Sequence, residues 1–179
     1  EGGLEGCEAP PLPAAGTMFA HIRRAGAAGF GTGRPWRVLP LVDAVDATGR
    51  KRGALAWLTV HAAPPHRGCA VGCVGINDAA ALVAPAGRAL LTAVARRMCG
   101  GLFLIEAGAN RFTCLPGEAL DVGAKVVNCG GKEVAATVRI DLLESERVVW
   151  SKAVAMRAEP HSTGSLDSHG VRARAVPQP

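Results

Sequence analysis

The sequence predicts a chain that begins with an α+β segment and ends with an all-β sandwich. Apolar runs separated by turn residues occupy residues 36–76, and one helical pattern follows Pro85. After residue 109, apolar and polar residues alternate strictly. A period of two is typical of strands that bury one face, whereas spacings of three and four are typical of a helix.

The α+β segment is expected over residues 36–108. Trp36–Val45 and residues 54–61 are apolar runs on either side of a turn signal at residues 46–50, so they predict a hairpin. A third short apolar run, residues 69–76, predicts a buried strand.

A helix is expected from Pro85 to the glycine pair at residues 100–101. Leu91, Val94 and Met98 recur at spacings of three and four, so they predict the buried face of this helix. Glycine ends a helix cheaply because it accepts the left-handed conformation of a C-terminal cap.

The all-β part is expected over residues 109–160. Apolar and polar residues alternate along residues 120–126 and 134–142, and Asn128-Cys129-Gly130-Gly131 between them is a turn signal. A further strand is expected from residue 147. Regularly spaced strands joined by turns predict a sandwich whose polar faces stay in water.

Both ends of the chain are expected to lie outside these units. Residues 1–35 are rich in Gly, Pro and Ala and are interpreted as a linker or the frayed end of a missing domain. The polar residues 161–179 are interpreted as a disordered tail. Because the chain begins with Glu1 rather than Met, we interpret it as processed or cut from something longer.

Composition and charge argue against two classes of partner. The formal net charge is +5, but the arginines are dispersed and no aromatic residues interleave with them, so no nucleic-acid partner is expected. No run of about 18 apolar residues occurs, so no membrane span is expected. No motif indicates a cofactor.

One motif of the β part resembles the opening of bacterial immunoglobulin-like modules of the CARDB-like kind, over about residues 109–165. The residues that carry it are Leu115-Pro116-Gly117-Glu118, Val122, Val126-Val127-Asn128 and Gly130-Gly131. The resemblance implies an immunoglobulin-like sandwich. A complete module has about 100 residues, more than remain after residue 108, so an incomplete sandwich is expected.

The order of strands and helix over residues 36–100 resembles the last portion of a glutamine-amidotransferase-like α/β domain. Such domains occur beside immunoglobulin-like modules in bacterial glycoside hydrolases and their relatives. The two resemblances together imply a non-catalytic accessory or spacer region of a secreted or cell-surface carbohydrate-active protein. They also imply a missing upstream catalytic domain as its partner.

An enzymatic alternative centres on Cys73. Amidotransferases of this type carry a nucleophilic cysteine on a tight glycine elbow, and residues 71–75 read Val-Gly-Cys-Val-Gly. Val71 replaces the first glycine of that elbow, and the downstream His-x-Glu is absent. A divergent cysteine hydrolase would use Cys73 with His61 or His66. A core cysteine without chemistry is the interpretation that the sequence favours.

The tryptophans offer a third interpretation, an adhesion or carbohydrate-binding module. Trp36, Trp57 and Trp150 could each stack on a sugar ring. The chain has four Phe and no Tyr, so these three side chains are more simply explained as large core residues.

No metal site is expected. His61, His66, Cys69 and Cys73 are ligand types that zinc accepts and lie close together in the sequence. On one strand, however, Cys69 and Cys73 would be separated by about 13 Å, too far to share a tetrahedral ion.

Overall fold

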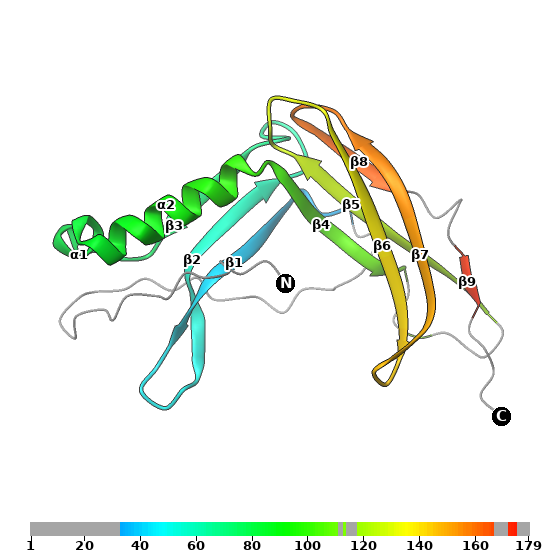
Figure 1. Cartoon of the computed structure of the whole chain (residues 1–179), viewed down its shortest axis with the longest axis horizontal. Helices are drawn as coiled ribbons and strands as arrows, with labels where there is room; N and C mark the ends of the chain where they lie inside the picture. Colours follow the sequence, from blue (N-terminus) through cyan, green and yellow to red (C-terminus); the bar gives the residue numbers. More distant parts are fainter. Residues whose placement is uncertain (1–32, 111–112, 114–117, 167–171, 175–179) are drawn as a thin grey trace.

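The computed structural model describes residues 33–110, 113, 118–166 and 172–174. Within these ranges the chain is mostly β-strand, and its strands pair antiparallel (Figure 1). The mainly β character predicted from the sequence is confirmed. Most of the linker predicted for residues 1–35, and the motif residues 115–117, lie outside the described residues.

The first sheet contains β1 (Trp36–Val45), β2 (Lys51–His61) and β3 (Ala70–Val74) in that order. The predicted hairpin of β1 and β2 is confirmed. Bulges interrupt its register between Pro40 and Val45, so the pairing of the two strands does not follow from counting outward from the turn.

Asp46 holds the turn of this hairpin. The carboxylate accepts hydrogen bonds from the Thr48 hydroxyl at 2.6 Å and from the backbone N–H of Arg50 at 3.0 Å. These bonds stabilise the charged form and lower the pKa of Asp46 to about 2. A turn that satisfies its own polar groups explains why the hairpin forms at this point in the sequence.

Two helices follow the sheet, α1 (Ala79–Val83) and α2 (Pro85–Cys99). The limits predicted for α2 are confirmed, whereas α1, whose N-terminus is capped by Asp78, was not predicted. No described helix has the length and apolar character that crossing a bilayer requires.

The buried face predicted for α2 is confirmed at Val94 and Met98 and wrong at Leu91. Leu90 is fully buried, whereas Leu91 is 42% exposed. Leu90, Val94 and Met98 follow one another at spacings of four and lie over the sheet. Two neighbouring leucines fit the periodicity almost equally well, and only the position of the sheet selects between them.

A second sheet contains β4 (Leu102–Ala109), β5 (Ala119–Asn128) and β8 (Ser162–Leu166), with β9 (Arg172–Arg174) paired to the start of β5. The disordered tail predicted for residues 161–179 is therefore wrong for β8 and β9. The polar composition of β8 is typical of an unstructured tail, but its backbone groups pair with β5 and complete the edge of that strand.

The central strand β5 differs from its prediction in one respect. Its alternating pattern does form a strand, but Gly123 and Val127 are as buried as Val122 and Ala124. On one face Val127 belongs to the core cluster with Leu58 and Leu90, and the other face contacts the hairpin described next. A strand that is buried on both faces loses the wet polar side that alternation predicts.

The hairpin of β6 (Val134–Glu144) and β7 (Arg147–Ala158) forms a separate layer. Figure 1 shows it crossing in front of β4 and β5, and β7 lies against β8. A β-carbon on Gly164 of β8 would lie 2.9 Å from Cε of Met156, so the two layers meet closely there. This layering is compatible with a β-sandwich.

One hydrophobic core joins the two predicted units. Leu58 of β2, Leu90 of α2, Phe103 of β4 and Val127 of β5 are all at most 1% exposed and belong to one cluster. The predicted division after residue 108 would separate β4 from its hydrogen-bonded partner β5. The first sheet and the second therefore form one packed body through this cluster.

Candidate functional site

The face of the first sheet that points away from α2 carries two of the three tryptophans. Gly72 and Leu58 face α2, because a β-carbon on Gly72 would contact Val94 and Met98. Their neighbours along each strand therefore point the other way. We call this surface the Trp36–Trp57 face; its residues are Trp36, Val38, Pro40, Trp57, Thr59, His61, Val71 and Cys73.

Strand register places the two tryptophans at a definite separation. Trp36 pairs with His61 and Pro40 pairs with Trp57, so the Cα positions of the two tryptophans are offset by four residues along the strands. At about 3.3 Å per residue this separation is about 13 Å. Thr59 lies between them on β2 and adds a hydroxyl that can donate and accept hydrogen bonds.

This face is partly accessible to solvent. Trp36 is 51% exposed and Val71 is 49% exposed, whereas Trp57 and His61 are half-buried. Exposed large apolar groups beside hydrogen-bonding side chains are typical of a recognition surface. An indole offers a flat apolar ring together with one N–H donor, which suits the apolar face and the hydroxyls of a sugar.

Trp150 does not join this surface. It lies on β7, opposite Leu142 of β6, and is half-buried. Of the three sugar-stacking candidates, the structure therefore brings together Trp36 and Trp57 only. Sequence reasoning could not select this pair, because the bulges in β1 hide the register of the hairpin.

Cys73 lies inside a strand rather than on an elbow. It pairs with Trp57 in the interior of β3, and helix α1 begins only at Ala79. An exposed nucleophile of the amidotransferase kind needs a sharp strand-to-helix turn at the cysteine itself. Gly72, read as part of that elbow, instead allows α2 to approach β3.

The two histidines of the enzymatic alternative lie at the far end of the sheet from Cys73. The register places His61 four residues from the Cys73–Trp57 pair, which is about 13 Å along the strands. The ring of His66 packs edge-on against that of His61, with centroids 5.4 Å apart. Proton transfer needs hydrogen-bond reach, so this geometry does not assemble a cysteine–histidine pair.

The side chains that could bind a metal ion lie apart from one another in the part of the chain that the structure describes. No group of three or more His, Cys, Asp or Glu side chains there could hold one ion. Cys69 lies in the loop before β3, where its backbone N–H donates to the carbonyl of His66.

Sequence reasoning missed a junction at one end of the core, where the loop before β3 meets the turn after β5. The Thr163 hydroxyl of β8 donates to the carbonyl of Ala62 at 3.0 Å, which links the second sheet to this loop. Burial and, to a lesser degree, the negative charge of Cys69 raise the pKa of Cys129 to about 11. The loop that carries Cys69 approaches His161, and the next residue, Ser162, pairs with Asn128 beside Cys129.

Asn128 anchors the same turn and is fully buried. Its Nδ2 donates to the carbonyls of Lys132 and Ala158, both at 2.8 Å, and its Oδ1 accepts from the N–H of Gly130 at 2.8 Å. The side chain thereby ties the end of β5 to the end of β7. Its role is structural, because these three bonds go to backbone groups of the fold.

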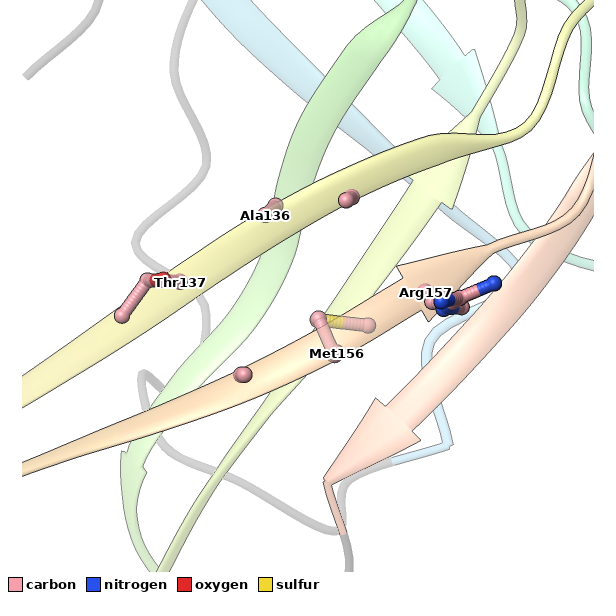
Figure 2. A pocket seen from close by; sticks show the side chains of 6 residues that line it. Ala136, Thr137, Met156 and Arg157 are labelled. Carbon is pink, nitrogen blue, oxygen red and sulfur yellow. The ribbon is translucent and has the colours of Figure 1, made fainter.

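A shallow groove lies over the β6–β7 hairpin (Figure 2). Its lining residues are Ala135, Ala136, Thr137, Ala155, Met156 and Arg157. This set contains one hydroxyl and one guanidinium but no carboxylate, thiol or imidazole. The groove therefore lacks the side chains that general acid–base chemistry uses.

Comparisons of this chain with protein-family models, with curated proteins and with solved structures found no match.

Proposed function

We propose that this chain is a non-catalytic accessory region of a secreted, glycoside-hydrolase-like carbohydrate-active protein. In this proposal residues 109–160 belong to an immunoglobulin-like module that serves as a rigid spacer beside an upstream catalytic domain. The observation that supports a spacer is the core shared by Leu58, Leu90, Phe103 and Val127. Two sheets that share one core cannot move freely against each other, so they would hold the domains on either side at a fixed distance. Two units joined only by a flexible linker would not.

The contacts around this core strengthen the same argument. Nη1 of Arg37 on β1 donates to the carbonyls of Leu104 and Ile105 on β4, at 3.2 and 2.9 Å. The backbone N–H of Arg34 donates to Oε1 of the buried Glu106 at 2.6 Å. These bonds tie the first sheet to β4, and β4 in turn pairs with β5 across the boundary predicted after residue 108.

Calorimetry of the whole chain tests the spacer. We expect a single unfolding transition, with calorimetric and van't Hoff enthalpies that agree, because one core unfolds as one unit. Two separated transitions would show that the halves unfold independently, and the spacer proposal would then fail.

The Trp36–Trp57 face favours a second function, binding of a polysaccharide. Two indoles on one sheet face, with backbone positions offset by about 13 Å along the strands, can stack on two sugar units of an extended chain. Thr59 between them can bond to sugar hydroxyls. This surface would let the accessory region hold the catalytic domain on its substrate.

Affinity electrophoresis in gels containing soluble glucans, xylans or chitosan tests this function. We expect retardation of the wild-type chain, weakened about tenfold by Trp36→Ala, since one aromatic contact contributes up to about 1.5 kcal/mol. Trp57→Ala should act in the same direction. Trp150→Ala is the matched control, because Trp150 lies on another sheet, and it should bind like wild type.

Equal retardation of the Trp36→Ala and Trp150→Ala variants would exclude the Trp36–Trp57 face as the binding surface. Far-ultraviolet circular dichroism of each variant separates lost binding from lost fold. The spacer proposal is independent of this result, since it depends on the unfolding transition alone.

A further inference from the structure

Two cysteines far apart in the sequence, Cys69 and Cys129, lie at the junction between the two sheets. Cys69 precedes β3, and its carbonyl accepts a hydrogen bond from the N–H of His61 at 2.9 Å. Cys129 follows β5, and its N–H donates to the carbonyl of Gly101 at 2.6 Å. Both cysteines are thiols in the structure, with Cys69 exposed and Cys129 half-buried.

Backbone contacts connect the neighbours of these two residues. A β-carbon on Gly68 would lie 2.5 Å from the carbonyl carbon of His161. The next residue, Ser162, pairs with Asn128, which directly precedes Cys129. Gly68, which adjoins Cys69, therefore contacts His161, and Asn128, which adjoins Cys129, pairs with Ser162. Residues 161–162 thus lie next to the neighbours of both cysteines.

Two further observations agree with this closeness. The bond from the Thr163 hydroxyl to the Ala62 carbonyl holds β8 against the same loop. The charge of Cys69 acts on the thiol of Cys129 and contributes to the raised pKa of that thiol. Charge effects on a pKa weaken with distance, which agrees with the approach of the two segments through Gly68, His161 and Ser162.

We propose that Cys69 and Cys129 form a reversible disulfide, with a small-molecule disulfide such as glutathione disulfide as the oxidant. The exposed Cys69 loses its proton to solvent and attacks one sulfur of the oxidant, which releases one glutathione thiol. Cys129 then loses its proton and attacks the sulfur of Cys69, which releases the second. Two protein thiols are oxidised, and one glutathione disulfide is reduced to two thiols.

The bond would join the first sheet to the second covalently. It closes the loop between residues 69 and 129, which contains β3, both helices, β4 and β5. A cross-link over a loop of this length restricts the unfolded chain and so stabilises the folded one. Secreted proteins meet the oxidising conditions under which such a bond persists.

Peptide mapping of the whole chain tests the proposal. The chain is equilibrated with glutathione disulfide, its remaining thiols are alkylated, and it is digested with trypsin. We expect a cross-linked species that joins residues 68–88 to residues 126–132, lighter by two hydrogens than the sum of the two peptides. The first peptide also contains Cys73, so the mapping is repeated in the Cys73→Ser variant.

Matched variants assign the bond. Cys69→Ser and Cys129→Ser should each abolish the cross-linked species, whereas Cys73→Ser and Cys99→Ser should retain it. The thermal midpoint of the oxidised wild type should exceed that of its reduced form, and this difference should vanish in Cys69→Ser. Cys69 is exposed, so its replacement keeps the test valid if Cys129→Ser fails to fold.

The proposal is overturned if folded wild-type protein carries glutathione on Cys69 without the link to Cys129. A cross-link from Cys69 to any other cysteine would overturn it equally.

Discussion

A β-carbon on Gly72 would lie 2.6 Å from Sδ of Met98 and 2.9 Å from Cγ1 of Val94, so β3 and α2 meet where the strand has no side chain. Such distances are too short for ordinary contact. The glycine that resembled part of a catalytic elbow is therefore explained by the packing of a helix on a sheet.

Gly72→Ala should destabilise the fold by about 1–2 kcal/mol, because an added methyl group in a packed core forces neighbours to shift. Denaturant unfolding measures this change. Gly131→Ala is the matched control, since nothing lies within 4 Å of its β-carbon position, and it should change stability by less than about 0.5 kcal/mol. Equal effects of both substitutions would contradict the packing argument.

Arg37→Met should lower the free energy of unfolding by about 2 kcal/mol or more. The substitution removes the two hydrogen bonds that the charged guanidinium donates to the carbonyls of Leu104 and Ile105. Burial, and then the neighbouring Arg34, lower the pKa of Arg37 from its usual value. Arg52→Met is the control. Its ion pair with Asp46 at 2.7 Å is exposed and should contribute at most about 0.5 kcal/mol. A similar loss in both variants would argue against a special role of Arg37.

Asn128→Asp should be more harmful than Asn128→Ala. A carboxylate would place oxygen where Nδ2 now donates to Lys132 and Ala158, so charge and carbonyl dipoles would repel inside the core. We expect a loss of about 2–3 kcal/mol for the alanine variant and a larger one for the aspartate, measured by thermal or denaturant unfolding. Asn110→Ala, which removes only an exposed bond to Asp121, should be nearly neutral. A larger loss of stability in Asn128→Ala than in Asn128→Asp would refute this account.

The reduced chain should lose stability at alkaline pH. The pKa of Cys129 is raised from 9.0 to about 11 in the folded state, so above pH 9 the unfolded chain releases this proton more readily than the folded one. The stability that the protonated Cys129 thiol contributes is complete below about pH 9 and is lost as the pH rises to about 11. Urea unfolding across this window under reducing conditions measures the decline, and Cys129→Ala should flatten it. An unchanged pH dependence in that variant would assign the decline to other groups.

Much of the local structure could be predicted from the sequence. The turn chemistry around Asp46 marks the first hairpin, and Pro85 with the glycine pair marks both ends of α2. These features depend on residues that are neighbours along the chain. The one-residue error on α2 and the missed strand β8 share a cause, because burial and edge pairing depend on partners distant in the sequence.

The candidate site could be predicted only as a set of residue types. Three tryptophans were equivalent in the sequence, and the register of β1 and β2 places Trp36 and Trp57 on one face and leaves Trp150 on another sheet. Cys73 is the conspicuous cysteine of the sequence, whereas the structure brings the neighbours of Cys69 and Cys129 together through residues 161–162. Register and the docking of sheets arise from long-range contacts that a local motif does not encode.

By itself the sequence determined where the strands of the two hairpins, β5 and the main helix occur, because alternation, periodicity and turn residues act over a few neighbouring positions. Only the tertiary structure decided that the two predicted units share one core, that β5 is covered on both faces, and which side chains meet at the junction of the sheets. Each of these depends on how layers pack to bury apolar surface, and that packing is settled by the whole chain at once.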